Sequence, residues 1–115
     1  MKSRQELNEE LRQSILALPR VTEQPNLGIH EDAFFVGRTM FMHIHGHGHC
    51  DIRLPKDIQE QVLAGGRAIP HRWAPGKGYV TSRVTDEKSL GTTIELIRLS
   101  YQYFHQHFAD ATESR

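Results

Sequence analysis

The chain reads Phe41-Met42-His43-Ile44-His45-Gly46-His47-Gly48-His49-Cys50-Asp51-Ile52-Arg53-Leu54 at its centre, with a histidine at every second position from residue 43 to residue 49. A period of two is the period of a β-strand, whose successive side chains point to opposite faces of a sheet. An extended backbone would therefore gather the imidazoles on one face and leave the other face to aliphatic side chains. The pattern predicts a β-hairpin with one polar and one apolar face.

The turn of this hairpin sets which side chains share a face, because a slip of one residue moves every side chain to the other face. A two-residue turn would mix the imidazoles with the aliphatic set. A three-residue loop, Gly46-His47-Gly48, would instead keep the two sets apart, with Gly48 in the left-handed conformation that such loops require. We predict this loop, with His47 at its tip and five polar side chains on one face: His43, His45, His49, Asp51 and Arg53.

The polar face has the composition of a metal site. Residues two apart on a strand lie roughly 7 Å apart, so two neighbouring histidines can share one ion and a third ligand must come across the hairpin. His43 and His45 are the first two candidates, and Asp51 or His49 is the third. His71, in a later loop, is a candidate fourth ligand. Such a set suits zinc, copper or iron.

Other uses of the histidine face stay open. Asp51 can orient His43 by a hydrogen bond instead of binding an ion itself. Imidazoles that titrate near neutral pH can act as acid and base or respond to pH. Polar side chains on the open face of an antiparallel sheet also need no partner but water, so the pattern has a purely structural interpretation as well. Cys50 points to the apolar face and is expected to be a small buried core residue.

Length and composition restrict the remaining classes of protein. At 115 residues the chain is predicted to form one domain over residues 1–115, with an ordered core at 3–108 and a frayed tail at 109–115. Lys plus Arg and Asp plus Glu both number 14, so no overall field favours nucleic acid or an anionic membrane. A lone cysteine, no membrane-length apolar run and no signal-peptide core favour a cytoplasmic protein.

The sequence before the hairpin predicts one helix and several extended segments. A helix over residues 5–17 begins at a capping box formed by Ser3 and Glu6. Phe41 shares the parity of the histidines, so we expect a β-bulge or a partial cover of the second face. The extended segments, which break at Pro25-Asn26, cover residues 21–24, 27–30, 33–36 and 39–45.

The sequence after the hairpin predicts two further helices and one strand. A short helix lies between Pro55 and Gly65-Gly66, a loop covers residues 69–78, and a strand covers 79–84. Asp86 caps a long helix whose apolar side chains recur at helical spacing: Leu90, Ile94, Ile97, Tyr101, Phe104 and Phe108. The predicted fold class is therefore α+β, with an antiparallel sheet of four to five strands packed against N-terminal, central short and long C-terminal helices.

Aromatic and cationic side chains cluster around the predicted loop at residues 69–78. Such a group can stack on a flat ligand or simply seal an edge of the core. Two arginines, Arg53 and Arg72, are available to an anionic group. The chain lacks a P-loop and any nucleotide or flavin fingerprint. The candidate ligand-binding residues are Arg53, Arg72, Trp73, Lys77 and Tyr79.

Several short motifs follow one another along the chain: Leu18-Pro19-x-Val21, Phe34-x-Val36-Gly37-Arg38, His43-Ile44-His45-Gly46, Asp51-Ile52, Ala64-Gly65-Gly66-Arg67-Ala68-x-Pro70-His71, Gly78-Tyr79-Val80 and Ile97-Arg98-Leu99-x-Tyr101. Together they resemble the small bacterial proteins of the luciferase-domain family. The layout is also similar to the YjbR-like group, whose double-wing fold has been linked to DNA binding. The resemblance implies an α+β sheet covered by helices.

The resemblance also bears on the site. Four positions match the family pattern, namely His43, His45, Asp51 and His71, whereas His47 and His49 fall where other polar residues are expected. The preferred metal ligands are therefore these four, with His49 as an alternate and zinc as the preferred divalent transition metal. The family label does not imply light emission, because a luciferase must hold a sizeable oxidisable substrate in a mostly apolar pocket of several hundred Å³.

Three functional hypotheses follow. The leading one is a metal-binding or small-molecule-binding site on the histidine-rich hairpin, with any catalysis hydrolytic or oxidative through the ion. The second is a nucleic-acid-binding module of YjbR-like type, which the neutral composition disfavours. The third is a protein-interaction module, such as a homodimer, that pairs through an open sheet face or an edge strand. The sequence does not identify a reaction or a substrate.

Overall fold

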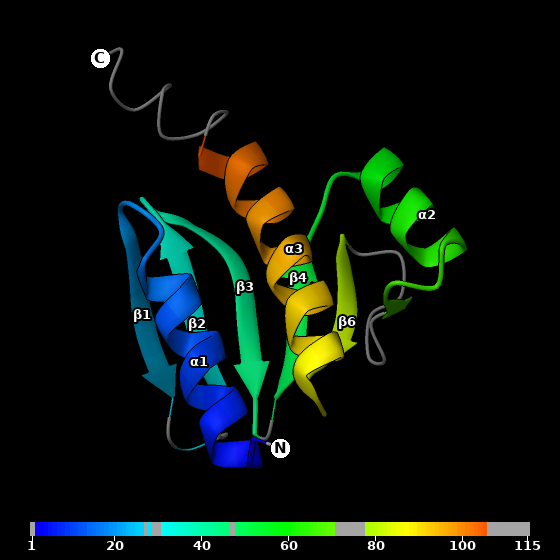
Figure 1. Cartoon of the computed structure of the whole chain (residues 1–115). Helices are drawn as coiled ribbons and strands as arrows, with labels where there is room; N and C mark the ends of the chain where they lie inside the picture. Colours follow the sequence, from blue (N-terminus) through cyan, green and yellow to red (C-terminus); the bar gives the residue numbers. More distant parts are fainter. Residues whose placement is uncertain (1, 27, 29–30, 47, 71–77, 106–115) are drawn as a thin grey trace.

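The computed structural model describes residues 2–26, 28, 31–46, 48–70 and 78–105. Helices α1 and α3 lie side by side across one face of an antiparallel sheet, and α2 lies beside one of its edges (Figure 1). The predicted α+β class is confirmed. The elements in chain order are α1 (Arg4–Leu16), β1 (Val21–Asn26), β2 (Glu31–Val36), β3 (Thr39–His45), β4 (His49–Arg53), α2 (Lys56–Ala64), β5 (Ile69–Pro70), β6 (Tyr79–Arg83) and α3 (Glu87–Phe104).

The described strands form one six-stranded sheet in the order β1-β2-β3-β4-β6-β5. The predicted count of four to five was too low, because Ile69–Pro70 adds a two-residue strand within the expected loop. The predicted break at Pro25 was also wrong, since β1 runs through it. β1 is an edge strand, where a proline without an N–H removes no ladder hydrogen bond. Residues 27, 29 and 30 of the predicted segment 27–30 lie outside the described residues.

A β-bulge at Phe41 puts the histidines on the face opposite the helices. Phe34 pairs with Met42 while Phe35 pairs with Met40, so Phe41 is the extra residue of β3. Phe41 and Met42 are both completely buried, and the Phe41 ring meets the ring of Tyr101 on α3 edge to face, with centroids 6.1 Å apart. Two consecutive side chains therefore face the helices, and the alternation resumes with His43 on the other side. The expected bulge is confirmed.

The helices are held by the predicted caps and apolar stripes. The Ser3–Glu6 capping box begins α1, and the Asp86 carboxylate accepts a hydrogen bond from the Ser89 N–H at the start of α3. Pro55 is the N-cap of α2 rather than its first helical residue. The side chains that α1 and α3 bury include Leu7, Leu11, Ile15, Leu90, Leu96, Ile97, Tyr101 and Phe104. The predicted core residue Phe108 lies outside the described residues.

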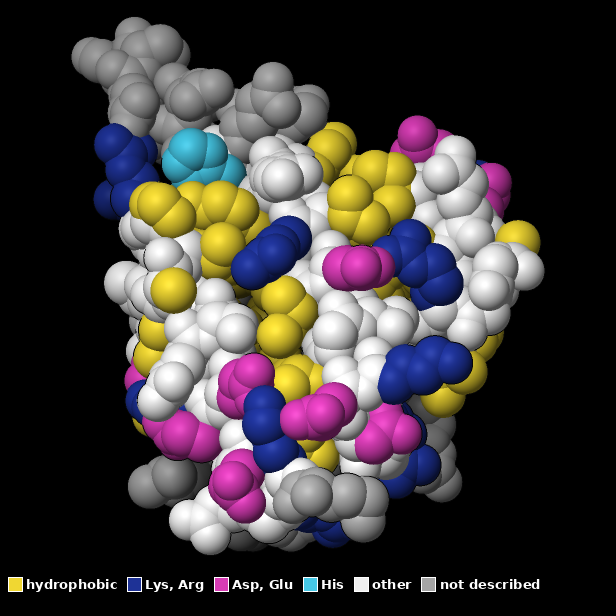
Figure 2. Space-filling view, in the orientation of Figure 1, with side chains coloured by type: hydrophobic (Ala, Val, Ile, Leu, Met, Phe, Trp, Pro, Cys, Tyr) yellow, Lys and Arg dark blue, Asp and Glu magenta, His cyan; other side chains and the backbone are white. Residues whose placement is uncertain are grey.

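The outer surface of the helical layer carries basic and acidic side chains in alternation, with apolar side chains between them (Figure 2). This arrangement agrees with a chain in which 14 basic and 14 acidic residues cancel. Among the described helices, none is both long enough and apolar enough to cross a membrane.

Candidate metal centre

The hairpin that carries the histidines has the predicted register. His43 pairs with Asp51 and His45 pairs with His49, as a three-residue loop requires. Gly48 has a φ of +72°, the left-handed conformation expected of it, whereas the tip residue His47 lies outside the described residues. Because of this register, β3 and β4 present imidazoles and a carboxylate on the same face of the sheet.

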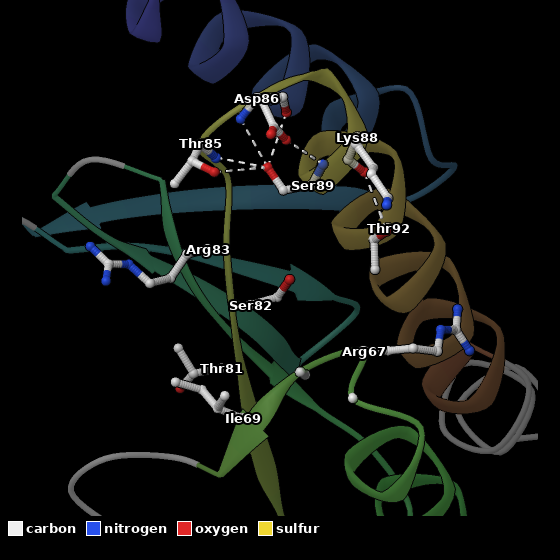
Figure 3. Close-up of a pocket in the computed structure, with 12 residues that line it drawn as sticks. Arg67, Ile69, Thr81, Ser82, Arg83, Thr85, Asp86, Lys88, Ser89 and Thr92 are labelled. Atoms are coloured by element: carbon white, nitrogen blue, oxygen red, sulfur yellow. Dashed lines mark hydrogen bonds between the residues drawn. The ribbon is translucent and has the colours of Figure 1, made fainter.

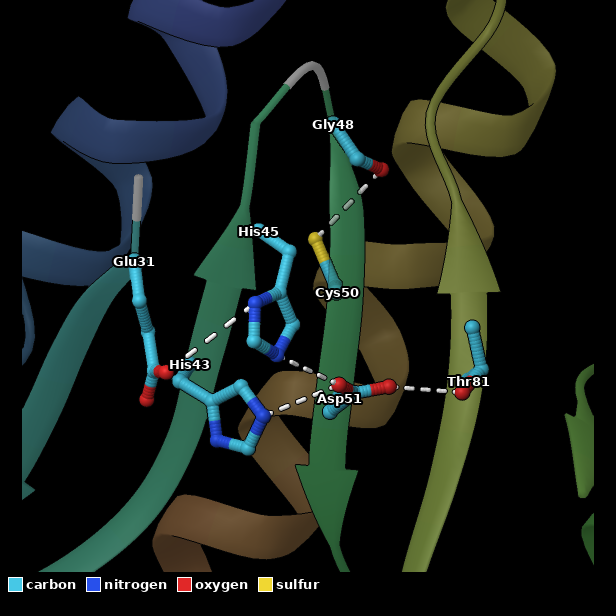
Figure 4. A network of polar contacts seen from close by, with 7 residues as sticks. All are labelled: Glu31, His43, His45, Gly48, Cys50, Asp51 and Thr81. Atoms are coloured by element: carbon cyan, nitrogen blue, oxygen red, sulfur yellow. Dashed lines mark hydrogen bonds and ion pairs between the residues drawn. The ribbon is translucent and has the colours of Figure 1, made fainter. Parts of the chain in front are cut away.

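Two imidazoles and one carboxylate converge at the centre of this face. The Nε2 atom of His43 lies 2.9 Å from Oδ2 of Asp51, and the Nε2 atom of His45 lies 3.2 Å from the same oxygen (Figure 4). The three ligand atoms all lie within 4.8 Å of one another. In a tetrahedral zinc site with bonds of about 2.05 Å, neighbouring ligand atoms are about 3.3 Å apart. The two distances to Asp51 are already close to this spacing.

The ligand atoms are held in place by side chains of neighbouring strands. Thr81 on β6 donates a hydrogen bond of 2.6 Å to Oδ1 of Asp51, which leaves Oδ2 to face the imidazoles. Glu31 on β2 lies opposite His45, and its carboxylate is 4.0 Å from Nδ1 of His45. Outer residues of this kind orient the ligands of metal sites. The arrangement supplies an outer partner on each side of the three ligand atoms.

The site is buried on one side and open on the other. Asp51 is 3% exposed and His43 is 8% exposed, whereas the His45 side chain is 37% exposed. The ring of the half-buried Tyr79 lies beside the His43 ring, with their centroids 5.5 Å apart. Burial raises the pKa of the Tyr79 phenol above its usual value, so this side chain is neutral at neutral pH. An ion or ligand would therefore approach from the side of His45.

Cys50 takes no part in this cluster. Its side chain is completely buried on the opposite face, and burial raises the pKa of the thiol to about 12. The thiol is therefore protonated at neutral pH, and its sulfur lies 3.8 Å from the carbonyl oxygen of Gly48. A thiol with so high a pKa is neither a nucleophile nor a good metal ligand. The expectation of a small core residue is confirmed.

The remaining candidate residues have different positions. His49 lies opposite His45 but is not in the group of three converging ligand atoms. The guanidinium of Arg53 lies over the ring of Phe104, 4.8 Å from its centroid, so it packs at the end of α3. Tyr79 lies against His43, as described above. Four candidates lie outside the described residues: His71, Arg72, Trp73 and Lys77.

Two residues of the site were missed by the sequence analysis, Glu31 and Thr81. Thr81 has the same parity as Tyr79 in its strand, but only the strand order shows that β6 lies next to β4 and that Thr81 is opposite Asp51. Glu31 begins a strand whose start was placed at residue 33, so its pairing with His45 was not visible.

Comparison with known proteins bears on the same part of the chain. A family model described as Luciferase domain matches residues 38–100, more than half of the 115-residue chain. The matched region contains His43, His45, Asp51 and Thr81, whereas Glu31 precedes it. Searches of the curated proteins and of the solved structures found no significant match.

Proposed function

The chain belongs to the Luciferase domain family, and we propose that its histidine-rich hairpin binds a divalent transition-metal ion, with zinc preferred. The observation that carries this proposal is the shared oxygen of Asp51, which lies 2.9 Å and 3.2 Å from two imidazole nitrogens. The proposed ligands are His43 Nε2, His45 Nε2 and Asp51 Oδ2. His71 is the proposed fourth ligand and His49 the alternate.

The chemistry of the donors supports a transition metal. Two imidazoles with one carboxylate suit zinc, and the same set with open positions also suits iron, whereas calcium and magnesium prefer oxygen ligands. Thr81 holds one oxygen of Asp51, which favours coordination through the other oxygen alone. The exposed side of His45 leaves room for a water molecule or a small-molecule ligand at the ion. A zinc ion in such a site activates water or polarises a carbonyl or phosphoryl group.

Zinc titration of protein purified without a histidine tag tests the proposal. Elemental analysis and calorimetry should find one zinc per chain, and His43→Ala, His45→Ala and Asp51→Asn should each abolish this stoichiometric binding. His105→Ala is the matched control, because it removes an imidazole at the end of α3 that is not a proposed ligand, and it should retain the ion. Substoichiometric zinc that none of the substitutions changes would refute the proposal.

The contact between His43 and Asp51 also supports a second candidate function. Without an ion, a carboxylate 2.9 Å from an imidazole can orient it as a general base. The two candidates make different predictions for the titration, because a metal-free acid–base pair predicts no stoichiometric zinc binding by the wild-type protein. The reaction class then has to be found by substrate screening.

Further proposals concern partners and location. Nucleic-acid binding of the YjbR-like type predicts an affinity that falls steeply with added salt. A homodimer predicts twice the chain mass in solution. A cytoplasmic location is a further proposal, which cell fractionation tests.

A further inference from the structure

A cavity of about 480 Å³ lies at the edge of the sheet, outside the group of proposed metal ligands (Figure 3). It lies between β6, the segment that leads into β5, and the first turns of α3. Small-molecule sites typically measure about 300–1,000 Å³. The cavity therefore has the size of a binding site for a small metabolite.

The edge of β6 offers the cavity main-chain hydrogen-bonding groups. The Val84 N–H donates to the Gly48 carbonyl at the neighbouring strand β4, with a distance of 2.9 Å. Because N–H and C=O groups alternate between the two edges of an antiparallel strand, those of Arg83 point to the opposite edge. The pairing of β5 with β6 ends at Thr81, so β5 does not cover this part of the edge. A ligand in the cavity can accept a hydrogen bond from the Arg83 N–H.

The charged side chains of the cavity favour an anion. Three basic residues line it, Arg67, Arg83 and Lys88, against one acidic residue, Asp86. Asp86 is held by its cap, where its carboxylate accepts a 2.8 Å hydrogen bond from the Ser89 N–H. In Figure 3, Arg67 and Lys88 lie on the α3 side of the cavity, whereas the Arg83 side chain points away from α3. Two cationic side chains thus flank the space from one side.

Arg67 is able to turn to a ligand. Its guanidinium lies 3.0 Å from the carboxylate of Glu95, and both side chains are well exposed, at 40% and 67%. Exposed ion pairs contribute little free energy, so an anion that enters the cavity competes with Glu95 on favourable terms. An anion would gain charge-assisted hydrogen bonds from Arg67 and Lys88 and one from the main chain.

We propose that this cavity binds a small anionic molecule that carries a phosphate or carboxylate group. The donors are the Arg67 guanidinium, the Lys88 ammonium and the Arg83 N–H. None of these three donors is a proposed ligand of the ion, so the anion and the ion would be bound by different groups, although Thr81 lines the cavity and also donates a hydrogen bond to Asp51.

The proposal is tested by titrating the full chain with inorganic pyrophosphate or with citrate at constant ionic strength. The amide NMR chemical shifts are measured at each step. Saturable shifts are expected at residues 66–69, 81–83 and 85–92. Arg67→Gln and Lys88→Gln should each weaken binding about tenfold or more. Arg98→Gln is the matched control, because it removes one positive charge from an exposed position of α3 outside the cavity, and it should bind as the wild type does. A preference for pyrophosphate or citrate identifies the recognised group.

Three results would overturn the proposal. The first is that neither probe produces saturable shifts. The second is that Arg98→Gln weakens binding as much as the cavity substitutions do. The third is that the shifts are lost in His43→Ala. The last result would place the anion at the metal centre instead. Retention of the shifts in His43→Ala supports a separate site, whatever the outcome of the zinc titration.

Discussion

Two aspartates in the same sheet have opposite surroundings. Asp51 on β4 faces the open side, where two imidazole nitrogens lie 2.9 Å and 3.2 Å from one oxygen and a hydroxyl lies 2.6 Å from the other. Asp32 on β2 lies beside the carboxyl group of Glu23. Burial and the hydrogen bond with Glu23 raise the pKa of Asp32 to about 6, although Arg12 opposes the shift.

The difference lies in the partners rather than in burial alone. Asp51 is surrounded by groups that can donate hydrogen bonds or share a cation. Arg12 lowers the pKa of Asp32 only in part, because its guanidinium binds Glu23, through Nε at 3.1 Å and through a second contact from Nη2. Oδ1 of Asp32 is buried without a hydrogen-bond partner in the described part of the chain. One carboxyl group therefore belongs to a group of side chains that could hold a metal ion, whereas the other binds a proton more tightly than usual.

The same substitution at the two positions should have different effects on zinc binding. Asp51→Asn removes a proposed ligand and should lower the zinc affinity by well over 100-fold, because changes in outer partners alone cost about 10–100-fold. Asp32→Asn should leave the zinc affinity unchanged, since it lies on the helix side of the sheet. Calorimetric titration of both variants measures this contrast. Equal affinities in the two variants would remove the distinction between the sites.

Substitution of the two glycines of the hairpin loop should lower the stability of the protein by different amounts. Both have positive φ, but a Cβ atom at Gly48 would lie 2.9 Å from the Val84 carbonyl oxygen, whereas one at Gly46 meets nothing within 4 Å. Gly46→Ala should cost about 1 kcal/mol of unfolding free energy for the left-handed backbone. Gly48→Ala should cost about 3 kcal/mol, because the backbone clash is added. Denaturant unfolding measures both, and equal losses would contradict the role of the close contact.

Thr81 should matter to the metal centre and not to the Asp32 cluster. Thr81→Val keeps the shape of the side chain but removes the 2.6 Å hydrogen bond to Asp51. The zinc affinity should fall about 10–100-fold, as for other outer partners. Glu31→Gln should have a smaller effect, because its carboxylate is 4.0 Å from His45. A Thr81→Val protein with wild-type zinc affinity would show that Thr81 does not position the ligand.

Asp32 should give the protein a characteristic pH dependence of stability. Its pKa in the folded protein, about 6, exceeds the ordinary value of 3.8, so the folded state binds the proton more tightly than the unfolded state. Protonated Asp32 therefore stabilises the folded state fully below the unfolded pKa of 3.8. This stabilisation is lost as the pH rises through the folded pKa of about 6, and stability does not change further with Asp32 above that pH. Solvent screening of this partly exposed carboxyl group reduces the effect well below the roughly 3 kcal/mol that the full shift implies. Asp32→Asn should therefore be about 1 kcal/mol more stable than the wild type near pH 7.5 and similar to it near pH 4.

Thermal unfolding over this pH range measures the difference. Among the described residues, the charged groups that shift the pKa of Asp32 are Glu23 on β1 and Arg12 on α1. A variant that is less stable than the wild type at neutral pH would show that Asp32 is ionised and stabilising in the folded protein.

Local sequence patterns predicted the centre of the molecule well. The alternation of histidines and the glycines at 46 and 48 predicted the hairpin register, since strand pairing across a tight turn depends on few residues. The caps at Ser3 and Asp86 predicted both long helices for the same reason. These signals are short-range, so the sequence displays them directly.

Long-range pairing was not readable in the same way. The place of β6 next to β4, which brings Thr81 to Asp51, depends on the order of strands far apart in the chain. The two-residue strand β5 and the passage of β1 through Pro25 also depend on positions at the sheet edges. The cluster of Asp32 with Glu23 and Arg12 combines two strands and a helix, and no local pattern indicated it.

The proposed metal centre can be tested by one crystallographic measurement. Crystals of the tag-free protein grown with zinc would be measured at the zinc absorption edge to locate the ion by anomalous scattering. We predict a single strong peak about 2 Å from His43 Nε2, His45 Nε2 and Asp51 Oδ2. A map without a peak between these atoms, or with the zinc bound only at other histidines, would contradict the assignment.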